Sequence, residues 1–343
     1  KGIDFLITKE RDYLVLKTSK PSSAVETLKM IFGISWFARA EETKSDMKSI
    51  EGRALKMAKY IGPNETFAVR ASRADKSFPH TSMEIENMIG KRIDRKVDLS
   101  KPDRTIHVEV KKDKSYVYSE KTEGAGGLPV GVSGKILCLM SGGMDSPVAA
   151  WMMMRRGCYP AFVYFSSYPL VPKSDRENVI KVLRVLRGYS SRPLTLIIVP
   201  LVKITEAVTN AVEGKYKCVI GRRIMYRVSE AMAKETKAKA LLTGDSLAQV
   251  ASQTLDNILS EDDVLTMPVL KPLIGMDKRD IIRIAEEIGT YEISKNIKTS
   301  CPIHTGKPAT KSTPERLAEE ERNVKKLDAL IRKAIKEAEV VRI

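Results

Sequence analysis

The sequence predicts an α/β domain with a mostly parallel sheet and helices on both faces, preceded by two smaller α+β units. A chain of 343 residues is too long for one ordinary hydrophobic core. After about residue 135, short apolar segments alternate regularly with helical ones, whereas the two types are irregularly mixed before it. A glycine-rich stretch, residues 124–131, separates the two regions and is typical of a hinge or linker.

Residues 1–44 predict a small α+β unit. A strand is expected from Tyr13 to Lys17, and a helix from Ser22 to Ile31 with Ser22 or Ser23 as its cap. The chain opens on Lys1 and enters a strand-like stretch almost at once, so we expect this unit to be incomplete.

Residues 45–123 predict a second α+β unit, and residues 124–134 a linker. Residues 45–60 and Ser82 to Arg92 have helical patterns. Strands are expected at Thr66 to Arg70, Thr105 to Val110 and Ser115 to Tyr118.

Residues 135–343 predict the third domain. Expected strands are 136–140, 161–165, 194–199, 240–243 and about 264–268, and expected helices are 146–156, 174–188, 219–235 and 277–287. This alternation is typical of a parallel sheet covered on both faces. Thr313 and Pro314 are expected to begin one long terminal helix, whose packing face is formed by Leu317, Val324, Leu327, Ile331 and Ala334.

The overall charge indicates a polyanionic partner. Lys and Arg number 59 against 43 Asp and Glu, which gives a net charge of +16 and a pI near 9.5. Nucleic acid or an acidic membrane surface would suit this charge, although ribosomal and thermophilic proteins share it. No run of 18 apolar residues and no secretory signal occur, so we expect a soluble, cytoplasmic protein.

The four cysteines are scattered along the chain. Cys138, Cys158, Cys218 and Cys301 show no CxxC spacing, which argues against a disulfide framework, a zinc ribbon and an iron-sulfur site. Cys301 and His304 form a single CxxH, which is weak evidence for a metal.

The strongest motif is the string LMSGGMDSP, which runs from Leu139 to Pro147 at the end of the first expected α/β strand. Gly142 and Gly143 let backbone amides approach a ligand without a Cβ clash. Ser146 suits a helix N-cap and Pro147 the first helical position, so the helix would direct free amides at the loop. The string therefore predicts an anion site at the carboxyl edge of the sheet. It is not a Walker A loop, because no GxxxxGK[ST] occurs.

SGGMDS resembles the PP-loop of the ATP pyrophosphatases. Further strings resemble the tRNA 4-thiouridine synthetase (ThiI) family, and they are GRRIMYR at 221–227, TGDSLAQVASQT at 243–254, PLIGMDK at 272–278 and TSCP at 299–302. Upstream, RASRADKSFP at 70–79 and GGLPVG at 126–131 resemble the THUMP RNA-binding domain, which follows a ferredoxin-like unit in this family. The resemblance covers nearly the whole chain.

The sequence departs from some members in two ways. It ends in a charged segment where those members carry a rhodanese-like domain, so the resemblance is to a short form without that domain. It also lacks the CxxC that holds an iron-sulfur cluster in other members. The source of sulfur is therefore the least defined part of the expected mechanism.

The resemblance implies specific roles for residues of the third domain. Asp145 is expected to be catalytic and a Mg²⁺ ligand, and Lys278, at the start of a helix, to meet an anionic ligand. The ATP pocket is expected to contain Leu139, Met140, Ser141, Gly142, Gly143, Ser146, Tyr164, Phe165, Arg222, Gly244 and Gln253. The alternatives are a core position for the strand-end residues and a solvated helix face for Arg222.

Sulfur transfer and RNA binding are assigned to other residues. Cys301 follows a polar, cationic stretch that favours the thiolate, so it is expected to be catalytic, with Cys218 as the other plausible sulfur carrier. Arg70, Arg73 and Lys76 are the expected phosphate ligands of the THUMP-like unit.

These assignments imply a tRNA uracil 4-sulfurtransferase. ATP would adenylate the eighth-position uridine of tRNA, and a cysteine desulfurase would supply the sulfur that gives 4-thiouridine. The resemblance also raises a role in making the thiazole of thiamine, and it allows a homodimer. The rival functions are another PP-loop ligase or amidotransferase, and a THUMP RNA-binding protein with an inactive nucleotide site.

Overall fold

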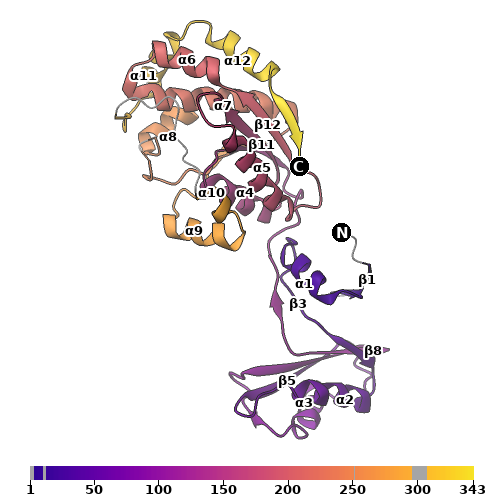
Figure 1. Ribbon diagram of the computed structural model, residues 1–343. Helices are drawn as coiled ribbons and strands as arrows, with labels where there is room; N and C mark the ends of the chain where they lie inside the picture. The colour runs from indigo at the N-terminus through magenta and orange to yellow at the C-terminus, as the bar shows by residue number, and fades with distance from the viewer. Residues whose placement is uncertain (1–3, 11–12, 251, 296–306) are drawn as a thin grey trace. The chain divides into compact units, whose positions relative to one another are not determined.

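The computed structural model describes residues 4–10, 13–250, 252–295 and 307–343. The chain forms two compact units (Figure 1). The N-terminal unit consists of residues 1–29 and 34–126, and the C-terminal unit of residues 30–33 and 127–343. Each has its own hydrophobic core. Among the helices of the described residues, none is both long and apolar enough to span a lipid bilayer.

The N-terminal unit is built on a five-stranded sheet with the order β4-β8-β7-β5-β6. Its strands are Glu41–Lys44 (β4), Lys114–Tyr118 (β8), Arg104–Val110 (β7), Thr66–Arg73 (β5) and Lys96–Val97 (β6). Two helices, α2 (Met47–Ala58) and α3 (Ser82–Gly90), supply buried isoleucines that pack with the apolar residues of β5 and β7. The expected strands and helices of residues 45–123 are therefore confirmed.

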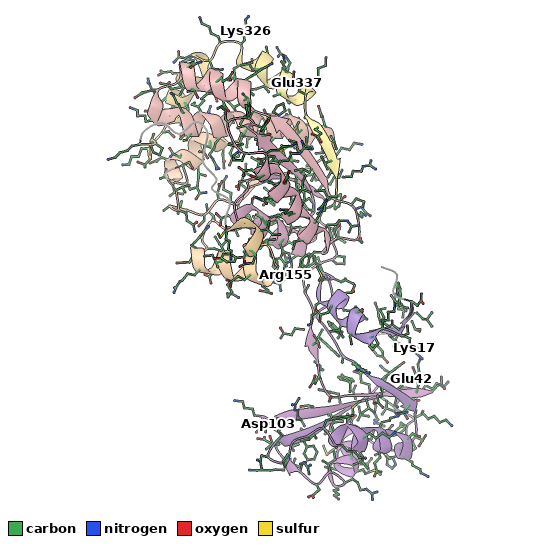
Figure 2. All side chains as sticks on the ribbon, in the orientation of Figure 1. Lys17, Glu42, Asp103, Arg155, Lys326 and Glu337 are labelled. Carbon is green, nitrogen blue, oxygen red and sulfur yellow. The ribbon has the colours of Figure 1, made fainter. Side chains whose placement is uncertain are left out.

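The first residues of this unit form an additional hairpin and a helix. Strands β1 (Phe5–Lys9) and β2 (Leu14–Thr18) pair antiparallel, and α1 (Pro21–Lys29) follows. Ser22 and Ser23 lie inside α1, so their expected capping role is wrong: the rigid ring of Pro21 suits the first helical position. Lys17 of β2 and Glu42 of β4 form an ion pair of 2.8 Å (Figure 2). Two short strands, β3 (Trp36–Phe37) and β9 (Thr122–Glu123), also pair.

The C-terminal unit contains a six-stranded sheet with the order β14-β13-β10-β11-β12-β15. The strands are Val269–Leu270 (β14), Leu241–Leu242 (β13), Lys135–Met140 (β10), Tyr159–Ser166 (β11), Thr195–Pro200 (β12) and Glu339–Arg342 (β15). The first five are parallel, and β15 runs antiparallel to β12. The central strands are buried on both faces, which explains their continuous apolar sequences.

Helices cover both faces of this sheet (Figure 1). One core combines inward-facing residues of β10, β11 and β12 with apolar side chains of α6 (Val202–Ala211), α7 (Lys217–Thr236), α11 (Pro314–Arg322) and α12 (Leu327–Lys336). The other helices are α4 (Asp145–Arg155), α5 (Ser174–Arg187), α8 (Leu255–Asp262), α9 (Lys278–Glu287) and α10 (Tyr291–Ser294). The parallel sheet and its two helical layers agree with the predicted fold class.

Several details of the prediction for this unit are wrong. The strand expected at 264–268 lies at 269–270, while α6 and α8 were not expected at all. The single terminal helix is two helices, α11 and α12, because Lys326 adopts a left-handed conformation (φ 58°) between them. Leu317 of α11 and Ile331 of α12 are buried in the same core, so the apolar residues keep a helical spacing across the two helices. For this reason the sequence pattern did not reveal where one helix ends and the next begins.

The glycine-rich stretch is tied to the C-terminal unit from Gly127 onward. Leu128 donates its N–H to the carbonyl of Arg155, and Gly131 to that of Gly157. A Cβ atom on Gly127 would lie 2.2 Å from the Arg155 carbonyl oxygen, so only glycine permits this approach. The C-terminal unit also includes Phe32, whose ring stacks on Tyr189 at a centroid distance of 5.5 Å and meets Trp151 edge-on at 5.7 Å.

Candidate active site

The glycine loop of residues 141–144 joins the carboxyl end of β10 to α4. The helix begins at Asp145 after Met144, without a side-chain cap, so the expected capping role of Ser146 is wrong. The hydroxyl of Ser146 instead accepts the N–H of Ser141 at 3.2 Å, which closes the loop on itself. The first amides of α4 face the same end of the sheet, and such amides favour an anion.

Asp145 and Lys278 meet beside this loop. The Lys278 Nζ atom donates to Asp145 Oδ1 at 2.6 Å, although 133 positions separate the two residues. Lys278 is the first residue of α9, which begins after its N-cap Asp277. A cation is unfavourable at a helix N-terminus, and the Asp145 carboxylate offsets that cost. The structure thus brings together the two residues that the motifs assigned to the phosphates.

The segment after β13 packs directly on the first residues of α4, which follow the glycine loop. A Cβ atom on Gly244 would lie 2.7 Å from the backbone nitrogen of Ser146 and 2.8 Å from the carbonyl carbon of Asp145. Real Cβ atoms do not approach backbone so closely, and backbone at a helix start has little freedom to move. Gly244 therefore lies against the first two residues of α4, directly after the glycine loop.

The strand-end residues divide between the two faces of the sheet. Leu139 and Phe165 pack against the core formed with α6 and α7, whereas Met140 is buried on the opposite face. Tyr164, which pairs with Met140 in register, lines a cavity of about 280 Å³ together with Ser166, Tyr168, Pro172, Lys173 and Arg176. This cavity lies at the carboxyl end of β11 and has both aromatic and cationic lining residues.

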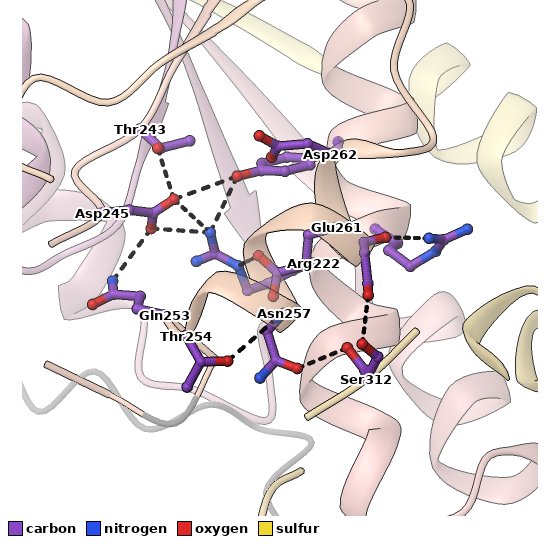
Figure 3. Close-up of polar contacts among 12 residues, drawn as sticks. Arg222, Thr243, Asp245, Gln253, Thr254, Asn257, Glu261, Asp262 and Ser312 are labelled. Carbon is purple, nitrogen blue, oxygen red and sulfur yellow. Dashed lines mark hydrogen bonds and ion pairs between the residues drawn. The ribbon is translucent and has the colours of Figure 1, made fainter. Parts of the chain in front are cut away.

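Arg222 on α7 is engaged by two buried carboxylates (Figure 3). Its Nη2 atom donates to both oxygens of Asp245 at 2.9 and 2.8 Å, and its Nε atom to Glu261 at 2.8 Å. The solvated helix face that was the alternative for Arg222 is thus excluded, because only 21% of its side chain is exposed. Gln253, also expected in the pocket, donates to Asp245 at 3.2 Å.

Asp245, Thr243, Tyr226 and Glu261 are residues of this network that the sequence analysis did not single out. Asp245 and Thr243 lie in the string at 243–254, directly after an apolar strand, and a carboxylate in that position was a usable signal. Glu261 lies on α8, a helix that was not expected, so nothing in the sequence pointed to it.

Burial raises the pKa of the Glu261 carboxyl to about 7, although the Arg222 charge acts in the opposite direction. The unfolded carboxyl releases its proton near pH 4.5 and the folded one near pH 7, so the free energy of unfolding falls as the pH rises between these values. One carboxyl with this shift accounts for about 3 kcal/mol.

We expect Glu261→Gln to remove this part of the pH dependence, because the amide has the same shape and no titration. Urea unfolding at pH 4.5 and 7.5 measures the effect. The wild type should lose stability relative to the variant over this interval, and equal changes in both proteins would contradict the pKa assigned to Glu261.

The chain segment that follows the expected sulfur carrier is held firmly. Cys301 itself lies outside the described residues. In the described residues that follow, Ala309 donates its N–H to the Lys215 carbonyl at 2.8 Å. Ser312 donates its hydroxyl to Asn257 Oδ1 at 2.7 Å (Figure 3). Cys218 lies three residues after Lys215, one helical turn before Arg222 and on the same face of α7. Ala309 thus lies beside the residues that immediately precede α7, the helix that carries Cys218 and Arg222.

The expected RNA ligands lie on or just after β5 in the N-terminal unit. Arg70 donates to the Leu99 carbonyl, and Arg73 donates to the Phe78 carbonyl at 3.1 Å. Lys76 is exposed. Arg73 therefore also supports the following loop, while the Lys76 charge is accessible to a phosphate.

The site fits a phosphate-bound Mg²⁺ better than a protein cage. Among the described residues, no group of three or more His, Cys, Asp or Glu side chains is arranged to hold a metal. Asp145 offers a partly exposed carboxylate beside the anion site, and Mg²⁺ commonly binds through one carboxylate, water and phosphate oxygens.

Comparisons with known proteins agree with this geometry. The family model described as "Thiamine biosynthesis protein (ThiI)" matches residues 131–326, and the THUMP domain model matches residues 44–120. A "Probable tRNA sulfurtransferase" of Brevibacillus brevis is 39% identical over 341 residues, which are 97% of this chain and 85% of the relative. One of Moorella thermoacetica is 40% identical over 304 residues, 87% of this chain and 77% of the relative.

A solved structure has the same fold over nearly the whole chain. It is described as a crystal structure of a 4-thiouridine synthetase–RNA complex with bound ATP, and it matches with a TM-score of 0.92 and 36% identity. The match covers 99% of this chain and 91% of that one. The resemblance that the motifs predicted is confirmed, and the chain belongs to the ThiI family.

Proposed function

We propose that this chain is an ATP-dependent tRNA sulfurtransferase that replaces the 4-oxygen of a uridine with sulfur. The observation that carries the proposal is the pairing of Asp145 with Lys278 beside the glycine loop, at the carboxyl edge of a parallel sheet. Curated relatives are called probable tRNA sulfurtransferases, and the matching structure contains RNA and ATP. Both support this reaction for the site.

The residues divide the first half of the reaction among them. The loop amides and Lys278 bind the phosphates of ATP, while Gly244 lets the β13 segment approach the start of α4. The uridine 4-oxygen attacks the α-phosphorus, and pyrophosphate leaves. The terminal sulfur of a protein persulfide then attacks carbon 4, and AMP departs with the original oxygen. A second thiol, from the chain or from an added thiol reductant, attacks the carrier sulfur, so that the S–S bond breaks, 4-thiouridine is released and the resulting disulfide is reduced by further thiol. The target within tRNA is the eighth-position uridine, as the family resemblance implies, and thiazole synthesis for thiamine is a second role of the same sulfur transfer.

Magnesium belongs to the proposal through Asp145. This carboxylate would hold the ion beside the phosphates, where Mg²⁺ neutralises phosphate charge. Lys278 would then exchange its contact with Asp145 for one with a phosphate oxygen, since one ammonium group cannot face both equally well.

The direct test is reconstitution. The purified chain is incubated with tRNA, Mg-ATP, a cysteine desulfurase and cysteine, and tRNA nucleosides are analysed by mass spectrometry while pyrophosphate is measured. We expect 4-thiouridine only with ATP, and none in tRNA whose eighth uridine is replaced by cytidine. Pyrophosphate release with incorporation of ammonia would favour the rival amidotransferase, and RNA binding without turnover would favour the inactive-site alternative.

Cys301→Ser should separate adenylation from sulfur transfer. We expect the variant to release pyrophosphate and yet form no 4-thiouridine when the desulfurase supplies sulfur, because a thiol must receive the persulfide. Free sulfide at high concentration should restore part of the product. Cys218→Ser is the matched control and should retain activity. Formation of 4-thiouridine by Cys301→Ser at the wild-type rate would remove Cys301 as the sulfur carrier.

In the proposed division of labour, residues 45–123 bind the RNA as the THUMP domain, and residues 1–44 support them as the ferredoxin-like unit. Residues 124–134 link these two units to residues 135–343, which perform the chemistry.

Binding of tRNA should weaken steeply with salt because phosphate contacts release counterions. Lys76→Ala should lower the slope of log K against log salt concentration by about one. Lys181→Ala, an exposed lysine of α5, serves as control. A flat salt dependence in filter-binding titrations would exclude a phosphate backbone as the ligand.

A further inference from the structure

Asp245 is the centre of a buried polar network in the C-terminal unit (Figure 3). Its carboxylate accepts hydrogen bonds from Arg222 and Gln253, from the Thr243 hydroxyl at 2.8 Å and from the Tyr226 hydroxyl at 3.4 Å. These donors come from α7, from the end of β13 and from the segment before α8. One side chain thus links three separate parts of the chain.

The carboxylate stays ionised in this position. Asp245 is 3% exposed, and burial acts to raise its pKa, but the Arg222 charge and the Thr243 hydroxyl outweigh burial and lower the pKa overall. A buried anion with this many donors is fully satisfied, so it holds its partners in fixed geometry.

Arg222 is the partner whose orientation Asp245 controls. Asp245 occupies Nη2 through both of its oxygens and Glu261 occupies Nε, so the plane of the guanidinium cannot rotate. Within the described part of the chain, no acceptor contacts Nη1. The fixed fork therefore leaves one N–H₂ group for a ligand.

Gln253 depends on the same carboxylate. Its side-chain amide donates to Asp245 Oδ1, while its backbone carbonyl accepts the N–H of Ala248, which has a left-handed conformation (φ 63°). Asp245 therefore orients Gln253 as well as Arg222, and the family resemblance assigns both residues to the nucleotide pocket.

We propose that Asp245 is a positioning residue, which acts through Arg222 and Gln253 to set the affinity of the site for ATP without touching the nucleotide itself. The inference rests on the proposed function, because it takes ATP as the ligand of this site. It adds a residue with a defined task, which is the orientation of two side chains from different segments.

The test compares Asp245→Asn with a control variant that disturbs Arg223, the residue next to Arg222 on α7. Asparagine keeps the volume and loses the charge that fixes Arg222, so we expect the KM for ATP to rise at least tenfold while the Kd for tRNA stays within twofold. Glu321→Gln is the control, since it weakens the neighbouring buried ion pair of Arg223, 3.1 Å from Nε to the carboxylate, outside the site. It should lower the melting temperature and leave the KM for ATP unchanged.

A double-mutant cycle separates positioning from general stability. If Asp245 acts through Arg222, Asp245→Asn in an Arg222→Ala background should cause little further rise in the KM for ATP. Losses that multiply in the double variant, or a KM for ATP within twofold of wild type in Asp245→Asn, would overturn the proposal.

A milder variant covers failure of Asp245→Asn to fold. Tyr226→Phe removes a hydroxyl that contacts both Asp245 and Arg222 and leaves a ring that the core accepts. It should raise the KM for ATP about threefold, the effect of one weak hydrogen bond, and an unchanged KM would count against the proposal. Because the KM for ATP is obtained from pyrophosphate release, which precedes sulfur transfer, a wild-type protein that releases pyrophosphate but makes no 4-thiouridine would contradict the proposed function and leave this inference testable and intact.

Discussion

Asp145→Ala should abolish tRNA thiolation, with pyrophosphate release reduced by about 10³-fold, the effect typical of removing a group that stabilises charge in a transition state. The variant loses the carboxylate beside the glycine loop and leaves Lys278 without its 2.6 Å partner. Binding of tRNA should remain within a few-fold of wild type, because the expected RNA ligands lie in the N-terminal unit.

Pyrophosphate release and tRNA binding are measured on the same preparation. Asp280→Ala provides the control, because Asp280 is an exposed residue of the first turn of α9. An equal loss of binding and turnover in Asp145→Ala would contradict the division of labour between the two units.

Gly244→Ala is the second substitution with a large expected effect. The new methyl group would lie within 2.9 Å of three backbone atoms at the start of α4, so either the loop or the β13 segment must shift. Forced overpacking of this kind costs about 1–3 kcal/mol. Here the displaced atoms are also those that we propose to meet the phosphates, so we expect ATP binding to be lost while the protein still folds with a lowered melting temperature.

Calorimetric titration with a non-hydrolysable ATP analogue checks this result. Gly52→Ala, on α2, is the control because nothing lies within 4 Å of its added Cβ atom. Wild-type affinity for the analogue in Gly244→Ala would show that the close approach to Ser146 is not needed for nucleotide binding.

The sequence predicted the parts of the fold that follow from a local pattern. Strands β10, β11 and β12 are continuous apolar runs, and the helices α4, α5, α7 and α9 between and after them have clear periodicity. β15 was missed because Glu339–Arg342 continues a charged segment, and only the edge of β12, far away in sequence, makes it a strand. The pairing of two strands that are far apart in sequence cannot be predicted from the local pattern of either strand.

The candidate site shows the same limit. The motif around Asp145 and the helix start at Lys278 were each recognisable, and parallel β-α connections bring their ends to one edge of the sheet. Arg222 was expected in the ATP pocket, and the structure shows that Asp245 and Glu261 hold its side chain. Burial creates that network, and burial of a charged side chain depends on the assembled fold.

Residues 30–33 bear on any attempt to cut the protein into separately expressed fragments. A fragment that starts at Gly127 would encode every strand and helix of the C-terminal unit and would still omit Phe32, which is 4% exposed between Trp151 and Tyr189. The rings of Trp151 and Tyr189 would be exposed to water in such a fragment, and exposed apolar patches promote aggregation. A soluble fragment therefore needs those rings covered, either by grafting Met30 to Gly33 ahead of Gly127 through a short linker or by polar substitutions at the exposed ring positions.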